Sequence, residues 1–97
     1  MKAIFIAFDQ AHRESVIEAL GSAMQRGFTC FEQVQGRGSV TGEPHYGSHA
    51  WAGENSAILT VCEDDRVKPI LERMRKIDLD KPMLGLRAFV LPVEDAI

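Results

Sequence analysis

The pattern of apolar and polar residues predicts regular structure along most of the chain. Residues 2–8 (KAIFIAF) are apolar on both faces of a strand, which is typical of a central strand covered on each side. A helix is expected from about Ala11 to Arg26, with Asp9 as its N-cap and Gly27 as its left-handed C-cap. Its inner face would carry apolar residues at three- and four-residue steps: Val16, Ile17, Leu20 and Met24.

Two further strands are predicted on either side of a long polar stretch. Residues 29–35 are rich in β-forming residues, although Glu32 and Gln33 interrupt the alternation of the strand and leave its facing open. Residues 57–62 (AILTVC) form a short and nearly continuous apolar run, which is typical of an interior strand.

The last part of the chain predicts a helix and a strand. Residues 63–76 would form a helix capped by Asp64 or Asp65, with Pro69 in the first turn, where its missing N–H costs nothing. The inner stripe of this helix would consist of Val67, Ile70, Leu71 and Met74. Residues 86–91 (LRAFVL) would form the final strand.

The order strand, helix, strand, loop, strand, helix, strand predicts an α+β fold of the ferredoxin-like βαββαβ type. A single domain over residues 1–97 would hold a four-stranded antiparallel sheet with two helices on one face. The other face would expose Phe5, Phe31 and Phe89, which we expect a second subunit to bury.

The loop at residues 35–55 (QGRGSVTGEPHYGSHAWAGEN) has no hydrophobic periodicity and no predicted secondary structure of its own. It holds five of the eight glycines, two of the three histidines, and the only tryptophan and tyrosine. Tyr46 and Trp51 argue against disorder, because disordered segments are poor in aromatic residues. Long loops in small domains are commonly functional, so we expect this loop to become ordered on a ligand, a partner or another subunit.

Composition and charge exclude several classes of protein. A net charge of −3 gives no basic face for nucleic acid, and no apolar run approaches the length of a membrane span. The first residues lack the features of a signal peptide, and Cys30 and Cys62 are too few for a secreted disulfide scaffold. Both cysteines are expected to be small buried residues of strands. We expect a cytoplasmic protein without direct membrane insertion.

The segments EQVQGRG and AILTVCEDDRVKPILERM, with the long insertion between them, resemble the PII-like signalling family over nearly the whole chain. The glycines that match its Gly-x-Gly segment and loop are Gly36, Gly38 and Gly42. The resemblance implies a non-enzymatic regulator that forms a homotrimer and holds a small effector in its subunit clefts. The loop would report the bound state to a partner protein, such as a membrane transporter.

Adenine nucleotides are the usual effectors in the family that the chain resembles. The expected ligand residues would be Gly36, Arg37 and Gly38 on the loop and Gly85 before the last strand, with Lys81 and Arg87 as phosphate partners. Arg37 could equally be an exposed side chain. The chain departs from the nucleotide-binding pattern at residues 39–40 (SV instead of RQ) and at residues 78–85 (DLDKPMLG instead of a glycine-rich loop). Tyr46 has no counterpart among the modifiable tyrosines of the family.

Two histidines in the loop suggest a transition metal as the alternative effector. His45 and His49 carry the side chain that most often binds zinc, copper, nickel and cobalt. Two imidazoles do not close a site, so Glu43, Glu54, Cys62, water or a neighbouring subunit would have to complete it. The simpler interpretation is that both histidines are solvated. The segment PHYGSH is similar to the branch of the PII-like family that is linked to heavy-metal efflux, which favours the metal.

Two other functions compete for this fold. An acylphosphatase-like enzyme would need its phosphate loop between the first strand and the first helix, where a helix N-terminus binds anions. Here the similar VQG segment at residues 34–36 follows the helix instead. An RNA-binding sheet would need aromatic and basic residues on its middle strands, and LRAFVL lacks that pattern. We therefore expect no catalytic residues and no nucleic-acid partner.

Overall fold

The computed structural model describes residues 1–34, 36–37, 44–45 and 55–97. In chain order the elements are β1 (Lys2–Asp9), the short 3-10 helix η1 (Gln10–His12), α1 (Arg13–Ser22), β2 (Thr29–Val34), β3 (Gly36–Arg37), β4 (Pro44–His45), β5 (Asn55–Cys62), α2 (Asp64–Asp80), the 3-10 turn η2 (Pro82–Leu84) and β6 (Arg87–Pro92).

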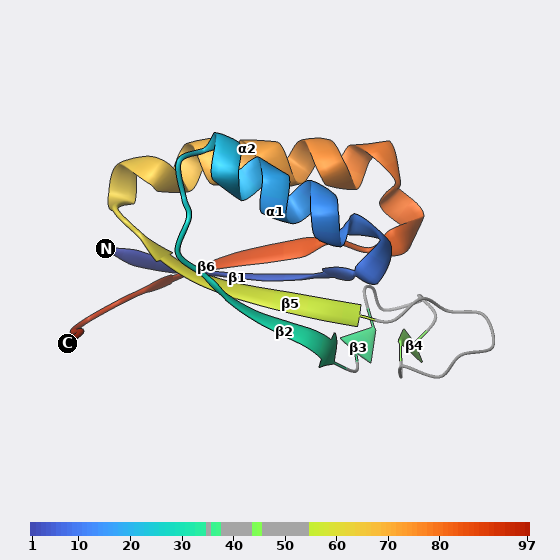
Figure 1. Cartoon of the computed structure of the whole chain (residues 1–97), viewed down its shortest axis with the longest axis horizontal. Coiled ribbons are helices and arrows are strands. Elements are labelled where there is room, and N and C mark those ends of the chain that lie inside the picture. Colours follow the sequence, from blue (N-terminus) through green and yellow to red (C-terminus); the bar gives the residue numbers. More distant parts are fainter. Residues whose placement is uncertain (35, 38–43, 46–54) are drawn as a thin grey trace.

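The main sheet has the strand order β2-β5-β1-β6, and every neighbouring pair is antiparallel. Both long helices cover the same face of this sheet (Figure 1). The ferredoxin-like prediction is therefore confirmed. Helix α1 connects β1 to β2, and helix α2 connects β5 to β6, and in both cases one strand lies between the two that are connected. The central strands are therefore β1 and β5, and the edge strands are β2 and β6.

The core lies between the sheet and the two helices. Ile4, Ile6 and Phe8 of β1 point into it and are fully buried, as their alternation along the strand predicts. Ile58 of β5 pairs with Ile6 and is also fully buried. Val16, Leu20, Ile70 and Met74 supply the helical side of the core. Burial of these apolar side chains is the main stabilising term of such a fold.

The other face of the sheet is apolar and uncovered. Phe5 pairs with Leu59 on one side and with Phe89 on the other, so these three side chains form one row. Phe31, Val61 and Leu91 extend the same surface, which we call the open sheet face. All six residues are exposed, although the sequence around β1 and β5 is typical of strands buried on both sides.

Helix α1 ends earlier than its sequence predicts, and the expected C-cap at Gly27 is wrong. The amide of Met24 donates to the carbonyl of Gly21 at 3.0 Å, and the amide of Gln25 donates to that of Leu20 at 2.8 Å. This pair of bonds is a Schellman motif, and it puts Met24 in the left-handed conformation with φ 64°. Arg66 of α2 stabilises the same end by donating to the carbonyls of Ala23 and Met24.

Asp9 acts as a cap before α1, as its position in the sequence predicts. The side chain of Asp9 accepts a hydrogen bond from the amide of Ala11 at 2.9 Å, so Asp9 caps the 3-10 turn that precedes the helix.

Helix α2 begins at Asp64, so Pro69 is its sixth residue and lies in the second turn rather than the first. The helix keeps this proline because packing of Ile70 and Met74 against the core stabilises it. The N-cap position is Glu63, whose side chain makes no capping bond. Instead the N-terminal ammonium contacts the Asp64 carboxylate at 2.6 Å, and this hydrogen bond lowers the pKa of Asp64.

The segment predicted as a structureless loop contains a short ladder. Gly36 pairs with His45 and Arg37 with Pro44 in an antiparallel arrangement. A two-residue strand is too short to give a periodic sequence pattern, so the sequence does not indicate it. Of the helices in residues 1–34 and 55–97, none is both long and apolar enough to cross a membrane.

Candidate functional site

Three strand ends and the loop connections meet at one end of the main sheet. Asp9, the last residue of β1, pairs with Asn55, the first residue of β5. Asn55 also pairs with Val34, the last residue of β2. Asp9 and Asn55 are both buried polar residues. Figure 1 shows β3 and β4 just beyond this end, with the chain termini toward the opposite end. We call this region the loop end of the sheet.

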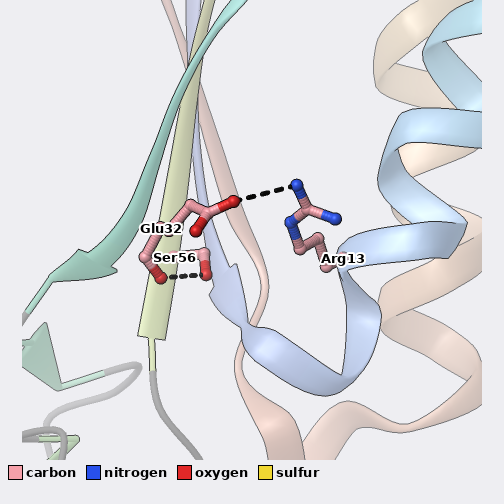
Figure 2. Close-up of polar contacts among 3 residues, drawn as sticks. All are labelled: Arg13, Glu32 and Ser56. Atoms are coloured by element: carbon pink, nitrogen blue, oxygen red, sulfur yellow. Dashed lines mark hydrogen bonds and ion pairs between the residues drawn. The ribbon is translucent and has the colours of Figure 1, made fainter.

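Ser56 ties the two stems of the loop together (Figure 2). Its hydroxyl is fully buried and donates to the carbonyl of Glu32 at 2.7 Å. The bond lies at a β-bulge, because the register of β2 against β5 shifts between Phe31 and Val34. The bulge is the physical reason for the broken alternation at Glu32 and Gln33.

Arg13 connects helix α1 to the same point. Its Nη2 lies 3.1 Å from Oε1 of Glu32, as Figure 2 shows. The exposed fractions of the two side chains are 38% and 71%. Solvent therefore screens the ion pair and limits its contribution to stability to about 0–1 kcal/mol. Nε of Arg13 is buried and has no hydrogen-bond partner among the described residues. No local sequence pattern indicates this contact, because it joins residues 19 positions apart.

The ligand residues expected on the loop are brought together only in part. The β3–β4 ladder places Gly36 and Arg37 opposite His45 and Pro44. Gly38, Glu43, His49 and Glu54 lie outside the described residues, as do Tyr46 and Trp51. Within the described part of the chain, no group of three or more His, Cys, Asp or Glu side chains could hold a metal ion. The site formed by His45, His49 and Glu43 therefore stays a prediction.

Cys62 lies far from the base of the loop along β5, so as a ligand beside His45 of the same chain it stays a prediction without support from the strand geometry. It is the last residue of β5, whereas the loop joins the strand at Asn55, seven residues earlier. At about 3.3 Å per residue, this separation is about 23 Å. Cys62 is buried as expected, and burial raises the pKa of its thiol, so the protonated form is favoured. Cys30 is only half buried.

Gly85 and Arg87 lie at the other edge of the sheet. Gly85 has φ 74°, a conformation that favours glycine, and ends the 3-10 turn before β6. The amide of Leu86 donates to Oδ1 of Asp78 at 3.4 Å, and Nη1 of Arg87 donates to the carbonyl of Leu86 at 2.8 Å. Arg87, Arg75 and Asp78 line a cavity of about 220 Å³ between α2 and β6.

The two groups of expected ligand residues share one end of the sheet but not one edge. Arg87 pairs with Ala7 near the end of β1, so β6 starts at the loop end. However, β2 and β6 are separated by two strands, and three interstrand spacings amount to about 14 Å. Within one chain, Gly36 and Arg37 therefore belong to one half of the loop end, and Gly85 and Arg87 to the other.

Comparison with known proteins identifies the family. A model of the family described as nitrogen regulatory protein P-II matches residues 1–97, the whole chain. The chain belongs to the P-II family. No curated protein sequence matches it.

Solved structures of P-II-like proteins share the fold. The chain resembles CPII of Thiomonas intermedia K12 bound to ADP and bicarbonate, with a TM-score of 0.73, 23% identity, and coverage of 93% of this chain and 82% of that one. CPII bound to ADP, AMP and bicarbonate gives a TM-score of 0.77, 22% identity and the same coverage. A PII-like signalling protein from Thermus thermophilus gives a TM-score of 0.66 and 19% identity, with coverage of 93% of this chain and 83% of that one.

Proposed function

We propose that this P-II family member is a regulatory homotrimer whose effector is an adenine nucleotide bound between subunits. One observation carries the proposal: the expected ligand residues lie at the same end of the sheet but on opposite edges. A second subunit would bring the Gly85–Arg87 edge of one chain against the Gly36–Arg37 edge of the next. The ADP and AMP bound to CPII support a nucleotide in this role.

The open sheet face supports the trimer. Contiguous exposed apolar surfaces of this kind mark protein interfaces, since leaving them in water is costly. Three copies of a twisted sheet can bury their apolar faces around a common axis while their loop ends stay accessible. Oligomerisation also suits a chain of this length, because a small domain buries too little surface on its own for high stability.

The loop is the element through which the effector would act. Its stems are fixed by Ser56 and by the β3–β4 ladder, so a ligand at Gly36 and Arg37 would contact the loop directly at its base. A nucleotide that binds one loop conformation more tightly shifts the population toward it. A partner protein, such as a membrane transporter, would recognise that conformation. In this proposal the protein is a regulator and not an enzyme. Its membership of the P-II family favours this role over that of an acylphosphatase-like enzyme.

The metal-sensing hypothesis becomes the second candidate. His45 pairs with Gly36 at the loop base, so a metal bound there would act on the same segment as a nucleotide. The loop sequence favours a metal over a nucleotide as effector. The ADP and AMP bound to CPII favour the nucleotide instead. The heavy-metal efflux branch stays a prediction.

Isothermal titration calorimetry separates these effectors. The titrants are ATP, ADP, AMP, bicarbonate, zinc and nickel, and the proteins are wild type, Arg87→Ala and Arg26→Ala. Arg26 is exposed in the connector after α1, so its variant is a matched control for the loss of one guanidinium. Loss of a charge-assisted phosphate contact should weaken nucleotide binding by about tenfold or more in Arg87→Ala and leave Arg26→Ala unchanged. Absence of any nucleotide heat in wild type would refute the proposal, and a metal heat would then favour the alternative.

A further inference from the structure

The bulge in β2 lies between the regular part of the strand and the base of the loop. From Phe31 to Val34, β2 advances by three residues, while its partner β5 goes back by two, from Ala57 to Asn55. One residue of β2 is therefore in excess, which is what defines a β-bulge. The position of that residue decides on which face of the sheet Val34 lies, because side chains alternate between the two faces along a strand.

Two contacts of Glu32 hold the bulge in this position. Its carbonyl accepts the hydrogen bond from the buried Ser56 hydroxyl, and its carboxylate forms the exposed ion pair with Arg13 (Figure 2). Glu32 and Gln33 are both exposed, so a shift of these two residues changes little buried surface. As an edge strand, β2 pairs with β5 alone in the main sheet, so a change of register breaks one ladder instead of two. The register of this strand end is thus set locally, and the Ser56 hydroxyl is one of its determinants.

A second register is available to the same residues. When the extra residue moves toward the loop, Gln33 takes the place of Val34 opposite Asn55, and the pairs up to Phe31 stay as they are. Val34 then lies on the opposite face of the sheet, away from the face that it shares with Phe31 in the observed register. The start of β3 at Gly36 moves by one residue along the strand, which is about 3.3 Å. The two registers therefore place the base of the loop differently.

We propose that this bulge is a register switch, with Ser56 as its positioning residue, and that the nucleotide at the loop base selects one of the two registers. The control by a nucleotide rests on the proposed function, because Gly36 and Arg37 follow closely after Val34 and move with it. A ligand shifts an equilibrium only by as much as its affinity differs between the two states. A nucleotide held between two subunits has such a difference, since a change of register moves the half of its site on β3 and leaves the half on the neighbouring chain in place.

Methyl NMR of Val34 in the full chain tests the switch. Relaxation dispersion and saturation transfer detect minor states that exchange in microseconds to milliseconds. Wild type should show a minor state at Val34 and none at Val61 or Val90, which lie in β5 and β6 away from the bulge. Saturating ADP should change its population by about fivefold or more, the lower end for coupling between two sites. ADP that binds in calorimetry but leaves the population unchanged would overturn the control by ligand. A minor state at Val34 in a protein that binds no ADP would refute the nucleotide and support the two registers.

Three variants distinguish a change of register from ordinary motion of an edge strand. Deletion of Gln33 removes the extra residue and lets Val34 keep Asn55 as its partner in a regular ladder, so the minor state should disappear. Gln33→Ala is the matched control, because it changes the same residue but keeps the extra position, and its minor state should persist. Ser56→Ala removes the hydroxyl that holds Glu32 and should raise the minor population about fivefold.

Two results would contradict the two registers. A minor state at Val34 that survives deletion of Gln33 would show fraying of the strand end instead of a change of register. Absence of a minor state at Val34 in both wild type and Ser56→Ala would show a single register.

Discussion

The open sheet face makes a strong prediction about assembly, and Phe89 tests it. Phe89 lies on the edge strand β6, pairs with Phe5, and is 57% exposed in the isolated chain. A phenylalanine presents about 200 Å², so about 110 Å² of its surface remains for a neighbour to cover. At about 25 cal/mol per Å², this burial contributes about 3 kcal/mol per subunit. Phe89→Asp loses that contribution and adds a carboxylate that costs several kcal/mol to bury unpaired.

The monomer should tolerate the same change. The side chain points to solvent in the single chain, so the substitution removes no core contact and costs only the weak strand propensity of aspartate, within about 1 kcal/mol. We therefore expect folded Phe89→Asp to sediment as a monomer, while wild type sediments as a trimer. Circular dichroism verifies that the variant is folded.

Leu79→Asp is the matched control for Phe89→Asp. Leu79 is even more exposed, at 77%, but it lies near the end of α2 in the helical layer, away from the open sheet face. This variant should remain trimeric. If Phe89→Asp keeps the size of wild type, or if Leu79→Asp dissociates equally, the sheet face is not the interface.

Four variants test two local arrangements by their effect on stability. Met24→Gly should stabilise the protein by about 1 kcal/mol in urea unfolding, because Met24 occupies the left-handed position of the Schellman motif and is 69% exposed. Gly27→Ala should be neutral or slightly stabilising, since an added Cβ meets nothing within 4 Å; a clear loss in either variant would contradict the assignment of the helix end. Ser56→Ala should cost about 1–3 kcal/mol because it leaves the Glu32 carbonyl without its partner at the bulge. Glu32→Ala should cost less than about 1 kcal/mol, and the reverse order in urea unfolding would show that the ion pair, not the hydroxyl, fixes the loop stem.

The sequence predicts the order of the main elements from the helical periods of α1 and α2 and from the apolar or β-forming runs of the strands. The residues Ile4, Ile6 and Phe8 alternate along β1, and Ile70 and Met74 recur at a helical step in α2, as the structure confirms. The apolar residues on the other face of the sheet were also expected to form an exposed surface. Such patterns follow directly from the geometry of the two elements.

What the sequence could not predict depends on contacts between distant segments. The position of Gly27 predicts the end of α1 there. In the structure the helix ends several residues earlier, where Arg66 of α2 donates hydrogen bonds to the carbonyls of Ala23 and Met24. The Arg13–Glu32 contact and the Ser56 hydroxyl bond leave no local pattern apart from the broken alternation of β2.

The candidate site was predicted residue by residue but not as an arrangement. Gly36 and Gly85 are expected from resemblance to a family, and Arg37 and Arg87 from their charge beside these glycines, but neither argument says how far apart the residues lie in one chain. Their separation across the sheet follows from the strand order β2-β5-β1-β6. The predicted ferredoxin-like fold implies this strand order, but no local motif says which strand ends the individual ligand residues occupy.

The central claim is that the nucleotide site needs two subunits, and one titration tests it most directly. ADP is titrated by calorimetry into wild type and into folded, monomeric Phe89→Asp, whose substitution lies outside the proposed ligand residues. The account predicts saturable binding of one ADP per chain to wild type and no measurable binding to the monomer. Binding of equal affinity to both proteins, or to neither, would contradict it.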